Sequence, residues 1–243
     1  MPEHIVTAFD AELKEIGRKV VEMGGQAERM LADGVSALIR RDAALGQKVI
    51  LQDASVDDTQ REIEERVIVV IAKRQPMAVD LRELVAAIRI ANDLERIGDL
   101  AKNVGKRVLA IEGEYHPQKL VRGVEHMADL VLEQLKEVID AYAGKNELQA
   151  VDVWRRDSAV DTMYTSLFRE LLTYMMEDPR NISVCTHLLF CAKNIERIGD
   201  HSTNIAETVY YMVTGRMLSD QRPKADLTSE TAVSFPRQPL QGS

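Results

Sequence analysis

The sequence predicts an all-α protein in which six long helices form two tandem antiparallel three-helix bundles related by an internal repeat. Aromatic residues make up 5% of the 243 residues, with only 13 Gly and 7 Pro, which excludes a β-sandwich or β-barrel. Apolar residues instead recur every three or four positions through long segments joined by very short connections, as in helical bundles. A motif near the end of the third segment returns near the end of the sixth, which indicates the repeat.

Proline and glycine mark where the predicted helices end. Gln75-Pro76 ends the second, Gly113 the third, Gly144 the fourth and Asp178-Pro179 the fifth, because proline cannot continue a helix and glycine favours its termination. The six segments with helical periodicity are, in order, about 5–40, 44–74, 78–112, 118–143, 147–177 and 181–216.

The repeat divides the chain into two units of similar size. We expect a first three-helix repeat over 1–113 and a second over 114–216. Residues 217–243 contain Pro223, Pro236 and Pro239 among many polar residues, which predicts a disordered C-terminal tail.

Charge and hydropathy exclude several classes of protein. The formal charge is −8 with a pI near 5.3, and no basic tract stands apart from acids, which argues against nucleic-acid binding and against an electrostatic membrane anchor. No window approaches 18 consecutive apolar residues, and the N-terminus lacks a signal-peptide layout. We therefore expect a cytoplasmic protein that reaches the inner membrane only through partners. Cys185 and Cys191 lie six residues apart in one predicted helix and point in different directions, so we expect free thiols.

The repeated motif is acidic. Residues 91–104 read ANDLERIGDLAKNV and residues 192–205 read AKNIERIGDHSTNI, with seven of fourteen positions identical. Upstream of each copy lies a second match, Asp-Ala-Ser-Val-Asp at 53–57 and Asp-Ser-Ala-Val-Asp at 157–161. Each half therefore contains one Asp-x-x-x-Asp and one Glu-x-x-x-Asp, which places both acids of a pair on one face of a helix.

These carboxylates interrupt apolar stripes, so we expect all four pairs to face inward. In an antiparallel hairpin, residues equidistant from the turn lie at the same level. The two acidic pairs of the first half are centred on Pro76, and those of the second half on the junction of Asp178 and Pro179. The sequence thus predicts two four-carboxylate clusters, consisting of Asp53, Asp57, Glu95 and Asp99, and of Asp157, Asp161, Glu196 and Asp200.

Four clustered carboxylates need positive charge nearby. Arg96 and Arg197 are the nearest cations in sequence, but they lie about 100° off the acidic faces. Carboxylate oxygens suit hard cations, so we expect bound magnesium, manganese or iron or, less typically, zinc, and four carboxylates can bridge more than one ion. Asn103 and Asn204, one turn after the last aspartates, are candidate additional ligands, and no organic cofactor is expected.

Other interpretations remain open at this stage. A single Asp-x-x-x-Asp is common on solvated helix faces, and His201 beside Asp200 is expected at the rim instead of in the ligand set, since Leu100 takes its place in the first half. No Gly-rich phosphate loop, nucleophile elbow or Glu-x-x-His di-iron signature is present, so no catalytic residue is expected.

The third predicted helix is apolar on two faces. Besides its acidic stripe, a second row lies on the opposite side, and it needs cover from the second repeat or from another chain. We therefore expect a homodimer or weak oligomer. The residues of this second row are Val79, Ala86, Ile90, Ile97, Ala101, Val104, Val108 and Ile111.

The paired motifs resemble the PhoU family of phosphate-uptake regulators. The opening FDAELKEIGRKVVEMGGQAERML is also similar to that family's first helix, and the resemblance spans roughly residues 5–215. It implies two three-helix bundles that bind multinuclear metal clusters through the eight acids named above. It also implies negative control of the phosphate-starvation regulon, through the ATPase of the phosphate transporter and a sensor histidine kinase, without enzymatic activity.

Two competing functions follow from the acids alone. One is an oxidase or hydrolase with a carboxylate-bridged metal pair, which would need an open coordination position and a general acid or base. The other is a metal-free helical scaffold. Elemental analysis of protein purified without a metal-affinity tag separates the scaffold from both metal-binding alternatives.

Overall fold

The computed structural model describes residues 2–114 and 118–218, with side chains from residue 8 onward, and all regular structure in these residues is helical. The elements are α1 (Pro2–Arg40), α2 (Ala43–Arg74), α3 (Ala78–Ala110), α4 (Gln118–Gly144), α5 (Glu147–Arg155), α6 (Asp157–Glu177), the short 3₁₀ helix η1 (Pro179–Asn181) and α7 (Ile182–Thr214). The helix bounds agree with the predicted segments to within a few residues. Of the predicted tail 217–243, residues 219–243 lie outside the described part of the chain.

Local capping explains where the helices start and stop. The Asp42 carboxylate accepts a hydrogen bond from the backbone N–H of Leu45 at 2.9 Å and caps α2. Asn146 caps α5 by accepting from two backbone N–H groups. Gln75 adopts a left-handed conformation before Pro76, and Gly215 does so at the end of α7. The predicted stop at residue 76 is therefore a true helix end.

The fifth predicted helix is not continuous. The chain turns at Arg156, where the backbone N–H of Ala159 bonds the Arg156 carbonyl in an i to i+3 turn, and the helix is divided into α5 and α6. The Arg156 side chain reaches across to Glu137 of α4. Hydrophobic periodicity missed this break because Val153, Trp154 and Val160 remain buried on both sides of it.

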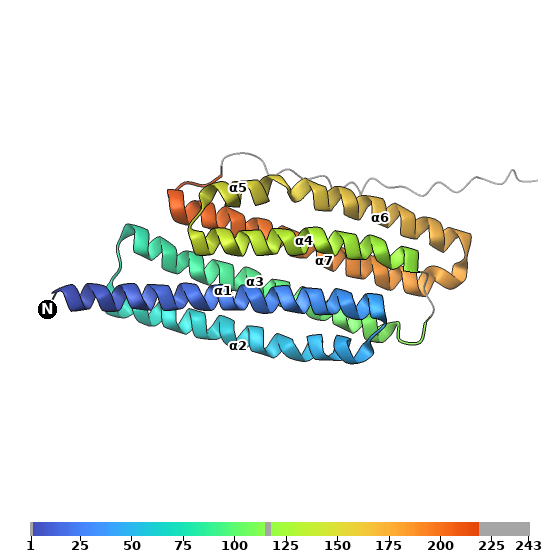
Figure 1. Ribbon diagram of the computed structural model, residues 1–243, viewed down its shortest axis with the longest axis horizontal. Coiled ribbons are helices and arrows are strands. Elements are labelled where there is room, and N and C mark those ends of the chain that lie inside the picture. Colours follow the sequence, from blue (N-terminus) through green and yellow to red (C-terminus); the bar gives the residue numbers. More distant parts are fainter. Residues whose placement is uncertain (1, 115–117, 219–243) are drawn as a thin grey trace, which may run out of the picture.

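The helices form two bundles lying along one another (Figure 1). The first consists of α1, α2 and α3, and the second consists of α4, α7 and the α5–α6 pair. The bundles join through α3 against α7 and α1 against α4. A single apolar core runs through both, so the two repeats form one folded body.

The second apolar face of α3 is covered by α7 of the same chain. Ile90, Ile97 and Val104 are fully buried there, although Val79 at the start of α3 is exposed. The two helices run antiparallel, since Asp93 pairs with His201 and Arg107 lies over the Phe190 ring at 4.3 Å. The face that suggested a homodimer is thus covered internally, and dimerisation stays a prediction that needs a different surface.

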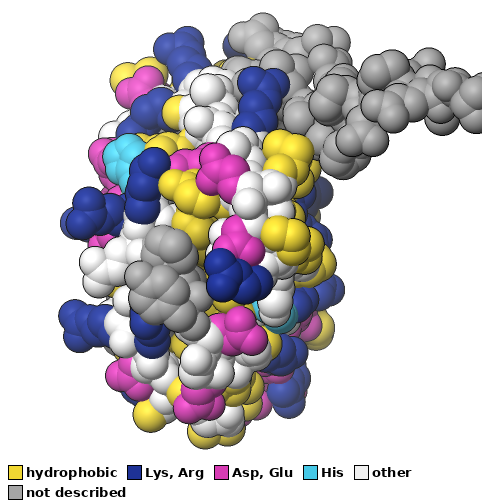
Figure 2. Space-filling model, turned by 90° about the vertical axis from the view of Figure 1, so that its right-hand side faces the viewer, with side chains coloured by type: hydrophobic (Ala, Val, Ile, Leu, Met, Phe, Trp, Pro, Cys, Tyr) yellow, Lys and Arg dark blue, Asp and Glu magenta, His cyan; other side chains and the backbone are white. Residues whose placement is uncertain are grey.

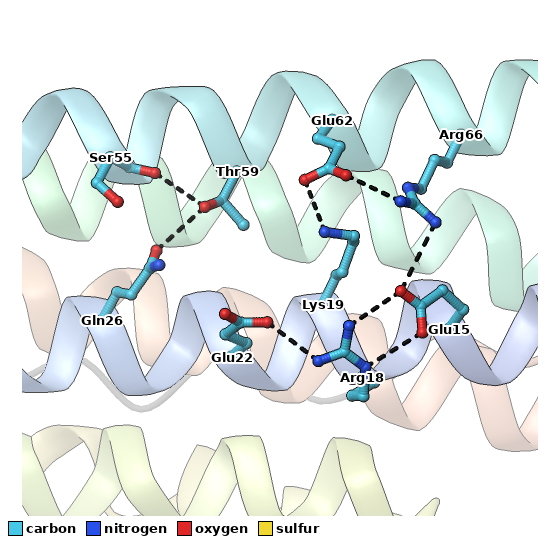
Figure 3. Close-up of polar contacts among 9 residues, drawn as sticks. All are labelled: Glu15, Arg18, Lys19, Glu22, Gln26, Ser55, Thr59, Glu62 and Arg66. Atoms are coloured by element: carbon cyan, nitrogen blue, oxygen red, sulfur yellow. Dashed lines mark hydrogen bonds and ion pairs between the residues drawn. The ribbon is translucent and has the colours of Figure 1, made fainter.

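The outer edge between α1 and α2 is held by polar contacts (Figure 3). Lys19 donates to Glu62 at 2.6 Å, and Glu62 also accepts from Arg66 at 2.9 Å. Arg66 lies 3.6 Å from Glu15, which also pairs with Arg18 at 2.9 Å. Because these residues form a connected network, they define the pairing of the two helices more firmly than isolated surface pairs would.

One end of the molecule has a surface of mixed charge (Figure 2). At the end of the molecule where α1 finishes and α2 begins, basic and acidic side chains are interspersed with scattered hydrophobic ones (Figure 2). Within the described residues, none of the helices has a stretch long and apolar enough to cross a membrane. Cys185 and Cys191 are both buried and free, as expected, and burial raises the pKa of the Cys191 thiol to about 12, so this thiol stays protonated and unreactive.

Candidate metal centres

The first carboxylate cluster lies between α2 and α3. Asp53 and Asp57 come from α2, and Glu95 and Asp99 come from α3, which packs along it. Asp53 is 6% exposed, and the other three are partly buried. Burial raises the pKa of Glu95, and the negative charges of Asp99, Asp57 and Asp53 raise it further, whereas Arg96 lowers it. The four carboxylates are therefore close enough to affect one another, as the hairpin geometry predicts.

A lysine occupies one end of the first cluster. Lys102 Nζ makes a short contact with Asp53 Oδ2 and lies 3.2 Å from Asp99 Oδ1. The hydrogen bond from Lys102 to Asp53 raises the pKa of the lysine, which stays charged. An ammonium group thus bridges one acid of α2 and one of α3.

Arg96 contacts the outer side of the same cluster, contrary to the prediction that it points away. Its Nε lies 3.3 Å from Glu95 Oε2, and its Nη1 lies 3.4 Å from Asp99 Oδ2. The flexible side chain bends back toward the acids while 63% of it remains exposed. The Asp57 and Glu95 end borders an open hollow that Gln60 and Arg96 also line.

The second cluster lies between α6 and α7 and is more deeply buried. Asp157, Asp161 and Glu196 are 2%, 5% and 5% exposed, and Asp200 is partly buried. Burial raises the pKa of Glu196, the hydrogen bond from Lys193 lowers it, and the charges of Asp200 and Asp161 raise it. Of the eight predicted ligands, four are therefore buried and four are partly buried.

The contacts within the second cluster differ from those in the first. Lys193 donates to Glu196 Oε1 at 2.9 Å, and its Nζ lies 4.9 Å from the centre of the Tyr164 ring. Thr203 donates to Asp157 Oδ1 at 2.9 Å. In the described part of the chain, Glu196 Oε2 is a buried acceptor with no hydrogen-bond partner. Such an oxygen can donate a lone pair to a cation without losing a hydrogen bond.

Sequence reasoning missed the two lysines and Thr203, because Arg96 and Arg197 were the only cations that it weighed against the acids. The spacing of the two lysines from the acids could have identified them. Lys102 follows Asp99 by three residues and Lys193 precedes Glu196 by three, a spacing at which oppositely charged side chains on a helix meet. Thr203 stands where the first half has Lys102, so comparison of the repeats also identifies it.

The donor chemistry fits a hard cation, although the shell is not preformed. Aspartate and glutamate oxygens from two helices are the ligands that such ions prefer. Within residues 2–114 and 118–218, no three acidic, histidine or cysteine side chains are arranged closely enough to hold an ion as they stand. A cation would therefore require side-chain rotations that bring the carboxylates together. Asn103 and Asn204 lie partly buried one turn beyond the last aspartates, at the edge of each cluster.

His201 lies at the junction of the two bundles. Its Nδ1 is 2.8 Å from Asp93 Oδ1 on α3. The side chain thus links α7 to α3, one residue after Asp200 of the second cluster, and its exclusion from the ligand set stays a prediction.

Comparison with known proteins identifies the family. The PhoU domain model matches the chain twice, over residues 20–108 and 124–209. The chain belongs to the PhoU family. Together the two PhoU matches cover most of α1 to α3 and of α4 to α7, so each bundle is one copy of the PhoU domain.

Individual PhoU proteins are similar over nearly the whole chain. The phosphate-specific transport system accessory protein PhoU homolog of Rhizobium meliloti is 62% identical over 93% of this chain and 95% of that protein. The crystal structure of PhoU from Pseudomonas aeruginosa has a TM-score of 0.80 and 39% identity, covering 86% of this chain and all of that one. The crystal structure of the phosphate transport system regulatory protein PhoU from Streptococcus pneumoniae has a TM-score of 0.80 and 25% identity. It covers 87% of this chain and 99% of that one.

Proposed function

We propose that this protein is a negative regulator of phosphate uptake and of the phosphate-starvation regulon that acts by metal-dependent protein contacts. The observation that carries the proposal is the full-length similarity to proteins named as accessory or regulatory components of phosphate transport, together with two PhoU domains. The carboxylate clusters are repeated in both domains at the same level, which supports a shared role. The action is binding, without catalysis.

In this proposal a hard cation, such as iron, zinc, manganese or magnesium, is held in each bundle. Asp53, Asp57, Glu95 and Asp99 hold it in the first bundle, and Asp157, Asp161, Glu196 and Asp200 hold it in the second, with Asn103 and Asn204 at the edges. The cation neutralises carboxylates that otherwise repel one another, and it links α2 to α3 and α6 to α7. Bound metal then fixes the surface that a partner recognises.

The proposed partners are the ATPase of the phosphate transporter and the sensor histidine kinase of the regulon. They would bring this cytoplasmic protein to the inner membrane. The net charge of −8 suits basic surfaces on such partners, chiefly by steering their encounter. A homodimer is proposed as the functional unit, and light scattering at micromolar concentration tests it directly, since a strict monomer would contradict it.

The regulatory role is tested by deleting the gene and measuring phosphate-starvation gene expression in high phosphate. We expect expression to rise, and the wild-type gene to restore repression. The paired variant Asp157→Asn with Asp161→Asn should fail to restore it, whereas the matched control Glu62→Gln, on the outer edge of the first bundle (Figure 3), should succeed.

Two outcomes together would contradict the proposal. Expression would stay at its repressed level after deletion, and the purified protein would bind neither the transporter ATPase nor the sensor kinase. A role in metal handling would then become the better explanation of the clusters.

A further inference from the structure

Each carboxylate cluster contains one lysine, and the two lysines occupy different positions of the repeat. Aligning 91–104 with 192–205 places Thr203 where Lys102 stands and Asn92 where Lys193 stands. Lys102 contacts Asp53 and Asp99, whereas Lys193 contacts Glu196. Both halves therefore hold an ammonium group against their acids, but each introduces it from its own position.

At the position where one half has a lysine, the other half has a neutral residue. Thr203 makes a hydrogen bond to Asp157 where the first half has the Lys102 to Asp53 ion pair. Asn92 accepts a hydrogen bond from Gln60 Nε2 at 2.9 Å where the second half places Lys193. Each half thus shows which neutral residue the fold accepts at the position where the other half has a lysine.

Both lysines can leave their acids without unfolding the helices. Their side chains are 25% exposed at Lys102 and 41% exposed at Lys193, so the flexible stems reach solvent by rotation. An ammonium and a divalent cation compete for the same carboxylate oxygens, and at close range they repel each other. Lys102 and a cation bound at the same time to Asp53 and Asp99 would bring these like charges together.

We propose that Lys102 and Lys193 are built-in counter-ions that a metal cation displaces, so that metal binding turns both ammonium groups out of the clusters toward solvent. This inference rests on the proposed metal binding. The lysines compensate the acids while metal is absent. Metal loading then exposes two ammonium groups that were held against the acids, and this change of surface charge gives a physical route from metal occupancy to partner contact.

The displacement is tested by measuring lysine reactivity in the full-length, untagged protein. An amine-acylating reagent is applied with chelator or with saturating Mn²⁺, and modification is measured by peptide mass spectrometry. We expect Lys102 and Lys193 to react at least about threefold faster with Mn²⁺, because each loses its carboxylate partner. Lys106, an exposed lysine on α3, is the control and should not change. Unchanged or slower modification in protein that binds Mn²⁺ would overturn the inference.

Exchange variants test the competition independently. Lys102→Thr and Lys193→Asn each introduce the residue of the other half, and titration calorimetry measures Mn²⁺ affinity. We expect at least about tenfold tighter binding at the altered cluster, because a like charge is removed from it. Lys106→Thr should leave the affinity unchanged. Weaker binding in both exchange variants would show that the lysines assist the metal, and would overturn the inference. Absence of Mn²⁺ binding in the wild type would instead refute the proposed metal function itself.

Discussion

The two halves of the molecule carry the same acids in the same register but stabilise them differently. In the first, one acid is deeply buried and Lys102 bridges it to Asp99. In the second, three acids are deeply buried, Lys193 contacts Glu196, and Thr203 supports Asp157. The two halves therefore share the positions of their acids along the helices. They differ in the residues that compensate the negative charge.

Backbone packing differs between the halves as well. In the first, α2 is one continuous helix and approaches α3 at Gly46 and Gly105. In the second, the corresponding residues are Ala150 and Ala206, and the equivalent of α2 is divided at Arg156, one residue before Asp157. Asp157 consequently lies in the first turn of α6, where a carboxylate interacts favourably with the helix N-terminus. In the second half, the N-terminus of α6 therefore helps to stabilise the buried Asp157 carboxylate.

The largest expected difference is in metal content. Asp99→Ala should remove about half of the metal bound at saturation, because it disables the first cluster and leaves the second. Asp200→Ala should do the same for the second, and the helical circular dichroism of both variants should be retained. Elemental analysis by mass spectrometry measures this. Loss of all metal from either single variant would show that the clusters are not independent.

The lysines should differ in their effect on stability without metal. Lys102→Thr should lower the free energy of unfolding by about 2 kcal/mol in chelator, since Asp53 is left buried without its charged partner. Lys193→Asn should cost about 1 kcal/mol or less, because its side chain is more exposed. Urea denaturation measures both. Equal costs would indicate that the two lysines are equivalent despite their positions.

The close approach of α2 and α3 predicts a further difference in stability. A Cβ at Gly105 would lie 2.9 Å from the Gly46 carbonyl oxygen, which is backbone and cannot rotate away. Gly105→Ala should therefore destabilise the protein by about 1 to 2 kcal/mol, even after the helix-propensity gain of alanine. Gly144→Ala, where a Cβ meets nothing within 4 Å, is the control. An unchanged melting temperature for Gly105→Ala would contradict this prediction. It would mean that α2 and α3 can separate enough to accept alanine, the residue that the second half has at the equivalent position.

The smallest expected effect depends on pH. The pKa of Glu196 is raised in the folded protein, chiefly by burial, so its ionisation costs stability as pH rises above the ordinary value of 4.5. In chelator at pH 7, Glu196→Gln should raise the melting temperature by about 2 to 4 °C, and this gain should vanish below about pH 4.5. Glu95→Gln should gain less, because that side chain is 24% exposed, against 5% for Glu196. A gain that persisted below pH 4 would exclude ionisation as its cause.

The fold could be predicted largely from the sequence because its signals are local. Apolar periodicity predicted the helices. Pro76 and Gly144 predicted the ends of α2 and α4. The break at Arg156 could not be predicted, because apolar residues keep their register across it and the Arg156 contact to Glu137 is made by a different helix.

The grouping of the acids was also predictable, since a short turn fixes which residues of a hairpin lie level. The compensating charges were not predicted. Lys102 and Lys193 lie three residues from Asp99 and Glu196, but the sequence alone does not show which of the nearby long cationic side chains turns toward the acids. Which acids would be fully buried also depends on tertiary contacts. Asp57 and Asp161 are equivalent in the repeat, yet only Asp161 is buried.

The most direct test of the two proposed cation sites is an anomalous difference map from crystals of the Mn²⁺-loaded protein, measured at the manganese absorption edge. We predict one group of peaks between α2 and α3 at Asp53, Asp57, Glu95 and Asp99. A second group should lie between α6 and α7 at Asp157, Asp161, Glu196 and Asp200. Peaks only elsewhere on the surface, or none in fully loaded crystals, would contradict the assignment of these carboxylates as metal ligands.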